Sequence, residues 1–154
     1  MNPVIRPRAV FAAVPFVLVA LSFVSNGIAQ TPAPIGHPII GKWQWTRPQN
    51  KCTEIYDFRP DGTVPVTSGA EKSDNTYTIA SIPDHDGFYR LTMRTTKDYG
   101  GRDCADDDSD NTGHESTNYV FFDPTRTMHV VCLEPKLDRC YGPLRRVEEA
   151  RRAP

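Results

Sequence analysis

The sequence predicts an all-β protein, an eight-stranded up-and-down antiparallel barrel. From residue 41 onward, short segments rich in β-branched and aromatic residues alternate with Gly, Pro, Asn and Asp turn signals, a pattern typical of a sandwich or a closed barrel. No stretch before the charged tail shows helical periodicity. Under up-and-down connectivity all four cysteines fall at one rim of the barrel, and this clustering favours that topology.

The first 29 residues are typical of an export signal. Arg6 and Arg8 form a short basic region, and an apolar stretch over residues 9–24 follows. Small residues then suit a signal peptidase, so we expect cleavage after Ala29. The alternative is a permanent N-terminal anchor, but a membrane-spanning helix needs about 20 apolar residues. We therefore expect a periplasmic or extracellular protein without a membrane anchor, beginning near Gln30.

The exported part has the size of one domain and a slightly acidic composition. Without the signal peptide and its two arginines, 125 residues remain, with 16 basic against 19 acidic residues and a net charge of −3. This length fits a single domain. The absence of a basic excess argues against nucleic acid and against an anionic membrane surface as partners.

The elements are expected in a simple order along the chain. A Pro-rich lead over residues 30–40 is incompatible with a helix or a central strand. The barrel domain follows over residues 41–146, and a charged tail over 147–154 ends the chain. Alternation of apolar and polar residues and the intervening turn signals predict strands at 41–46, 53–59, 63–68, 75–81, 87–95, 117–122, 127–133 and 139–145, with turns at 69–74, 83–87 and 123–124.

The four cysteines predict two disulfides rather than a metal site. An even count in an exported chain is typical of disulfides, and neither Cys-x-x-Cys spacing nor a His at ligand spacing is present. Cys132 and Cys140 would lie opposite each other in the last hairpin, which leaves Cys52 to pair with Cys104. The competing pairing, Cys52–Cys140 with Cys104–Cys132, also joins neighbours at the rim and stays open.

Both ends of the expected barrel resemble a known signature. Gly41-Lys42-Trp43 opens the first strand, and Arg145 or Arg146 follows the last one. This arrangement resembles the lipocalin-like (calycin) barrels, in a bacterial exported form. The resemblance implies that Gly41, Trp43 and Arg145 or Arg146 close the barrel bottom, where a guanidinium over an indole is favourable. The chain is shorter than typical secreted lipocalins and lacks their C-terminal helix, so calycin-like bacterial protease inhibitors are an alternative relative.

The sequence offers few groups for catalysis. It has no Gly-x-Ser-x-Gly motif and no cysteine left free by the disulfides, so we expect no enzyme and no cofactor. His129 lies in an alternating strand and is expected to face outward. The acidic segment 103–115 half resembles a calcium loop, but Tyr119 stands where the required Glu should be. It is therefore expected to be a solvated loop, with an adventitious cation site as the alternative.

Many large aromatic side chains are expected to share the inward face. An eight-stranded barrel is either filled by such side chains or holds one small ligand. Glu54 shares its side of the strand with Tyr56, so it would be a buried acid that needs a partner or a ligand. If the interior is hollow, Trp45, Glu54, Tyr56 and Tyr119 are expected to line the upper cavity. The full inward set is predicted to be Trp43, Trp45, Tyr56, Phe58, Tyr77, Tyr89, Tyr119 and Phe121.

Two functions follow from these features. The favoured one is an exported non-enzymatic binding module that recognises or inhibits another exported or periplasmic protein through its rim loops or its lead, because disulfide-stapled loops lower the ordering cost of recognition. The alternative is a carrier for one small apolar or aromatic ligand in the barrel cavity. A cavity above about 300 Å³ would favour the carrier, and a packed interior the module.

Overall fold

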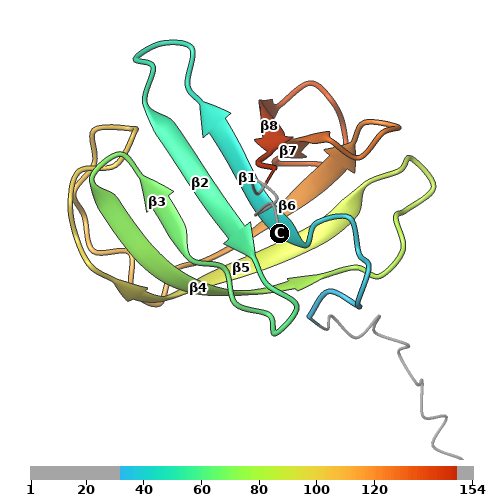
Figure 1. Cartoon of the computed structure of the whole chain (residues 1–154), viewed down its shortest axis with the longest axis horizontal. Helices are drawn as coiled ribbons and strands as arrows, with labels where there is room; N and C mark the ends of the chain where they lie inside the picture. Colours follow the sequence, from blue (N-terminus) through green and yellow to red (C-terminus); the bar gives the residue numbers. More distant parts are fainter. Residues whose placement is uncertain (1–31, 149–154) are drawn as a thin grey trace, which may run out of the picture.

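Eight antiparallel strands form one closed barrel, as the sequence predicts (Figure 1). The computed structural model of the chain describes residues 32–148, so the expected signal peptide and most of the charged tail lie outside the described residues. No helix in this part of the chain is long and apolar enough to cross a membrane. The strands are β1 (Gly41–Thr46), β2 (Thr53–Phe58), β3 (Val66–Ser68), β4 (Glu71–Ile79), β5 (Tyr89–Asp98), β6 (Glu115–Phe122), β7 (Met128–Cys132) and β8 (Cys140–Arg146).

The longest difference from the expected elements is at the start of β4. The predicted turn over residues 69–74 is wrong, because only Gly69 and Ala70 form the turn and β4 already begins at Glu71. Gly69 has a φ of 60°, a left-handed conformation that favours glycine. The residues that follow are polar and lie near the open end of the barrel, so no alternation of apolar and polar residues marks them as a strand.

The other boundaries move by a few residues. β3 begins at Val66 rather than at residue 63, because the Asp61 carboxylate accepts hydrogen bonds from both the backbone N–H and the hydroxyl of Thr63, which holds that segment in the turn. β5 extends to Asp98 and β6 begins at Glu115, so the long loop between them covers only residues 99–114. The polar ends of these strands lack the apolar signal that sequence patterns depend on.

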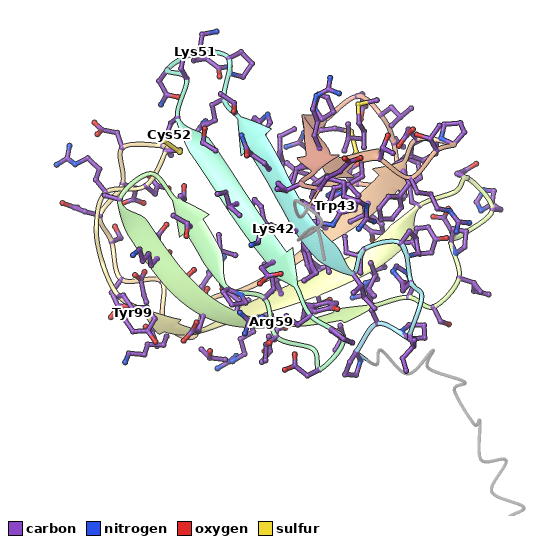
Figure 2. All side chains as sticks on the ribbon, viewed as in Figure 1. Lys42, Trp43, Lys51, Cys52, Arg59 and Tyr99 are labelled. Atoms are coloured by element: carbon purple, nitrogen blue, oxygen red, sulfur yellow. A yellow bond between two sulfur atoms is a disulfide. The ribbon has the colours of Figure 1, made fainter. Side chains whose placement is uncertain are left out.

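Both predicted disulfides are present and the competing pairing is absent from the structure. Cys52 is bonded to Cys104 with 5.5 Å between their Cα atoms, and Cys132 is bonded to Cys140 with 3.9 Å. Both lie at the end of the barrel opposite Gly41, which we call the upper end. Figure 2 shows Cys52 at the start of β2, just below Lys51 at the tip of the β1–β2 turn. Two disulfides indicate that the folded protein occupies an oxidising compartment.

The lower half of the barrel is an apolar core. Trp43, Ile79 and Val120 are at most 1% exposed, and their neighbours on the inward face are nearly as well buried. The lead is part of this core rather than a flanking segment, because Ile39 is 0% exposed and its carbonyl oxygen accepts a hydrogen bond of 2.7 Å from Trp43 Nε1. The lead thus covers the lower end and gives the buried indole N–H its acceptor.

Arg146 closes this lower end over Trp43. Its guanidinium carbon lies 4.2 Å from the centre of the indole ring. Its two terminal nitrogens donate hydrogen bonds of 2.8 Å to the Ile40 carbonyl and 2.6 Å to the Pro38 carbonyl. Arg145 does not take this place, since its Nη1 lies 3.0 Å from Met128 Sδ on the exposed side of the strand. Of the two arginines considered from the sequence, the structure therefore places Arg146 against Trp43.

Gly41 is required by this closure. Its φ is +127°, and a Cβ at this position would lie 2.5 Å from Arg146 Nη1. We expect Gly41→Ala to lower the free energy of unfolding by about 1–3 kcal/mol through backbone strain, and by about 1–3 kcal/mol more through displacement of the guanidinium. Gly36→Ala is the matched control, because Gly36 has a φ of +85° with no atom within 4 Å of its added Cβ. Urea denaturation measures both variants, and equal losses would show that the contact with Arg146 is unimportant.

Candidate functional site

The upper half of the barrel interior is polar and partly open to water. The strand register places its side chains on the same face as the core, but most of them are half-buried rather than fully buried. A barrel that served only as a scaffold could fill this space with apolar side chains, as its own lower half does. We call the following residues the upper interior: Trp45, Glu54, Tyr56, Ser68, Asn75, Met93, Asn118 and Tyr141.

Glu54 is the charged group at the centre of this set. It is 8% exposed, and its Oε2 accepts a hydrogen bond of 2.7 Å from the Tyr56 hydroxyl. Glu54 pairs with Trp45 across β1 and β2, so carboxylate and indole lie on the same stretch of the inner wall. The ring of Tyr141 packs against Trp45 with 5.2 Å between ring centres. One carboxylate, two phenols and one indole therefore face the same region from β1, β2 and β8.

The two tyrosines stay protonated and act as hydrogen-bond donors or acceptors. Burial raises the pKa of Tyr56 well above its usual range, and the nearby Tyr141 and Glu54 raise it further. Burial likewise raises the pKa of Tyr141 to about 12, with a further contribution from Glu54. Neither hydroxyl ionises at neutral pH, so Tyr56 remains able to donate to Glu54.

Comparisons supply no relative for this chain. No family model, no curated protein and no solved structure matches it.

The structure brings three of the four predicted cavity residues together. Trp45, Glu54 and Tyr56 share the inner wall, but the expectation that Tyr119 joins them is wrong. Tyr119 pairs with the exposed Arg90 and borders a hollow of about 400 Å³ on the outer face. Phe121 is also outside, where its ring packs 5.1 Å from that of Phe88. Both faces of β6 carry large apolar side chains towards the end of the strand, so alternation alone could not decide which one points inward.

Tyr141 belongs to the site but was missed in the sequence. A register shift lies in the β7–β8 pair, between His129 and Val131, which disturbs simple alternation along these strands. The signal that could have identified it is the disulfide itself. Because Cys132 pairs with Cys140, their neighbours Val131 and Tyr141 must also lie opposite each other and share one face.

His129 faces inward, contrary to expectation. It is 2% exposed, and its ring lies 4.3 Å from the centre of the Trp43 ring at the lower end. Among the described residues nothing forms a hydrogen bond with its buried Nδ1. Burial lowers the pKa of His129 to about 3, and the charge of Arg146 acts in the same direction. His129 is therefore a neutral core residue that packs against Trp43 at the lower end.

We expect His129 to weaken the fold in acid. The unfolded chain binds a proton on this histidine below pH 6.5, whereas the folded protein does so only near pH 3. Stability is therefore greatest above pH 6.5, and about 3 kcal/mol is lost on acidification to about pH 4. Urea denaturation from pH 7 to 4 should show that His129→Phe loses much of this slope, while the exposed His114→Phe control keeps it. His37, whose pKa is also lowered by burial, sustains a residual slope in all three proteins.

The acidic loop uses its carboxylates to fix its own backbone. Asp103 accepts hydrogen bonds from the backbone N–H groups of Ala105 and Asp107, both at 2.8 Å. Arg102 forms ion pairs with Asp106 at 3.0 Å and with Asp108 at 3.8 Å. Within residues 32–148 there is no group of three or more His, Cys, Asp or Glu side chains arranged to hold a metal ion. The loop is thus an ordered acidic part of the upper rim.

A second opening lies in the wall between β1 and β8. These strands pair over only two positions, Trp43 with Arg146 and Gln44 with Arg145. Above them the wall separates into a hollow of about 480 Å³ that Trp45 and Pro143 border. Pro143 has no backbone N–H and could not extend the pairing. This hollow lies in the barrel wall, so its volume does not count as the interior cavity that would favour a carrier.

Proposed function

We propose that this chain is an exported binding protein that holds one small molecule in the upper interior of its barrel. The observation that carries the proposal is Glu54, a carboxylate that is only 8% exposed and lies inside the barrel among half-buried aromatic and polar side chains. Burying such a group is unfavourable unless it is paired and hydrogen-bonded. A bound ligand that donates further hydrogen bonds to Glu54 would offset the cost of burying its carboxylate.

The expected export of the chain and its expected calycin-like family are consistent with this proposal. The basic and apolar segments before Ala29 support a cleaved signal peptide, and the two disulfides support an oxidising destination. The closed barrel, with Arg146 over Trp43 at one end, supports membership of the calycin-like barrels. N-terminal sequencing of exported material tests the first point, and it should begin at or within two residues of Gln30.

Filling the upper interior tests small-molecule binding. Ser116 lies on the inward face of β6 opposite Met93, and Thr117 is its outward neighbour. We expect the parent protein to bind at least one of three small aromatic probes, which are phenethylamine, phenethyl alcohol and hydrocinnamate, in isothermal titration calorimetry. Ser116→Trp should abolish that binding, and the matched Thr117→Trp control should retain it. Failure of the parent to bind any probe, or equal binding by both variants, would contradict the proposal.

Recognition of another protein through the rim loops is a second candidate. The loop over residues 99–114 is fixed by Cys104 and by its own carboxylates, and Tyr99 at its start is 56% exposed. A loop that is ordered in advance loses less entropy on binding. A pull-down from an extract of exported proteins tests this function. A partner captured by the parent should be lost with Tyr99→Ala, and capture of the same proteins by both would contradict a role for this loop.

A further inference from the structure

Within the described strands, the charged residues on the upper half of the inward face are acidic. The register places Glu54, Glu71 and Asp98 on this face, whereas the inward-facing Arg146 lies at the lower end. Burial raises the pKa of the Glu71 carboxyl, and the negative charge of the neighbouring Asp98 raises it further. The Arg47 guanidinium lies beside this face, but the three carboxylates outnumber it, so the upper interior favours cations over anions.

Glu54 has unused capacity to accept hydrogen bonds. A carboxylate offers two oxygens and about four lone-pair sites. The Tyr56 hydroxyl uses one of these sites, on Oε2. None of the ion pairs among residues 32–148 includes Glu54. A bound cation with N–H donors would supply the counter-charge and the missing hydrogen bonds together.

The walls beside Glu54 are aromatic. The rings of Trp45 and Tyr141 pack 5.2 Å apart, and the Tyr56 ring stacks on that of Phe58 with 6.4 Å between centres. Electron-rich faces of indole and phenol rings attract cations within about 6 Å. Trp45 already shows this property, since the guanidinium carbon of Arg47 lies 5.6 Å from its ring centre.

From this combination we infer that the ligand of the upper interior is a small organic amine in its ammonium form. Its N–H groups donate to the free positions of Glu54, and its hydrocarbon or aromatic part lies against Trp45 and Tyr141. The inference rests on the small-molecule binding proposed above and adds the charge class of the ligand. Acidic side chains along the 99–114 loop would raise the local concentration of such a cation near the rim.

Three probes that share a phenyl ring and differ in the charge of their polar end test the inference. Phenethylamine carries an ammonium group, phenethyl alcohol is neutral and hydrocinnamate is an anion, while all three share a phenyl ring on a short chain. For the full mature protein, calorimetry should show phenethylamine binding at least about tenfold more tightly than phenethyl alcohol, since a charge-assisted hydrogen bond exceeds a neutral one. Hydrocinnamate should bind most weakly.

Charge removal at Glu54 provides the second arm. Glu54→Gln keeps the shape and should weaken phenethylamine binding about tenfold or more while leaving phenethyl alcohol unchanged. The matched control is Glu115→Gln, because Glu115 is an exposed carboxylate on the outward face of β6 and its loss should leave all three affinities unchanged.

Some outcomes contradict only the assignment of an amine ligand, and another contradicts the proposed function as well. Equal or tighter binding of the neutral or anionic probe by the parent overturns the amine assignment while small-molecule binding stands. An unchanged phenethylamine affinity in a folded Glu54→Gln variant also overturns it. If that variant does not fold, the probe series on the parent protein decides alone. Binding of none of the three probes contradicts the proposed function and the inference with it.

Discussion

Trp43→Ala is expected to lower the free energy of unfolding by about 3–5 kcal/mol, the usual cost of removing a large buried aromatic side chain. Trp43 is 0% exposed, and its Nε1 donates a hydrogen bond to the Ile39 carbonyl. Its ring also packs against the Arg146 guanidinium at 4.2 Å and the His129 ring at 4.3 Å. The substitution therefore leaves a cavity and removes the donor for a buried carbonyl. It also takes away the surface on which the guanidinium rests.

Trp45→Ala is the control within the same strand. From the sequence alone the two tryptophans are expected to matter equally, but Trp45 is half-buried at the open upper end, where lost contacts are partly replaced by water. We expect it to cost clearly less than Trp43→Ala in urea denaturation. Equal losses would mean that the two ends of the barrel are packed alike. Negligible losses for Trp43 and for Arg146→Ala would remove the case for closure by this pair.

Loss of the Cys52–Cys104 disulfide is expected to cost about 4 kcal/mol, against about 2–3 kcal/mol for Cys132–Cys140. The first bond joins residues separated by 52 positions and the second joins residues separated by 8. A longer closed loop restricts the unfolded chain more, so its removal releases more entropy. Guanidinium denaturation of the two paired Cys→Ala variants measures the difference.

The Cys52–Cys104 disulfide also holds hydrogen bonds of the 99–114 loop in place, which adds to the expected cost of its loss. Cys104 N donates a 3.0 Å hydrogen bond to Ser68 Oγ, and the Asn50 side chain donates one of 2.9 Å to the Cys104 carbonyl. Without the bond these contacts must hold the 99–114 loop alone. A larger loss from the Cys132/Cys140 variant would contradict the chain-entropy argument. Non-reducing peptide mapping provides the check on pairing, since a peptide joining Cys104 to Cys132 would contradict the structure.

The sequence allowed correct prediction of the barrel and its disulfides because both depend on strong local signals. In β1 and β2 aromatic residues alternate with polar ones, and four cysteines at one end restrict the pairing. The predicted start of β4 is four residues too late, because the first four residues of the strand, Glu71 to Asp74, are polar. Tyr141 was missed because the register shift between β7 and β8 disturbs alternation in β8, and His129 was misjudged because a polar side chain in an alternating strand is expected to face outward. Irregular pairing of this kind depends on tertiary packing, which a period-two pattern does not contain.

The same limit applied to the site. Glu54 could be predicted as an inward acid from its parity with Tyr56, and the structure places it there. The presence of Tyr141 in the same region could not be predicted, because it comes from β8 at the far end of the chain and packs against Trp45. Tyr119 was assigned to the interior since both faces of β6 carry large apolar side chains, and only the packing of Val120 into the core decides between them.

The Pro-rich lead changes where the folding unit begins. Ala33 and Ile39 are within the core, and the carbonyls of Pro38 and Ile40 bind the Arg146 guanidinium. A shortened protein that started at the first strand would keep every strand and still lack the floor of its barrel. The Trp43 indole N–H would then have no acceptor in an apolar setting. The smallest independent unit of this chain therefore includes the lead at least from Ala33, a segment without regular structure whose main-chain carbonyls bind Trp43 and Arg146.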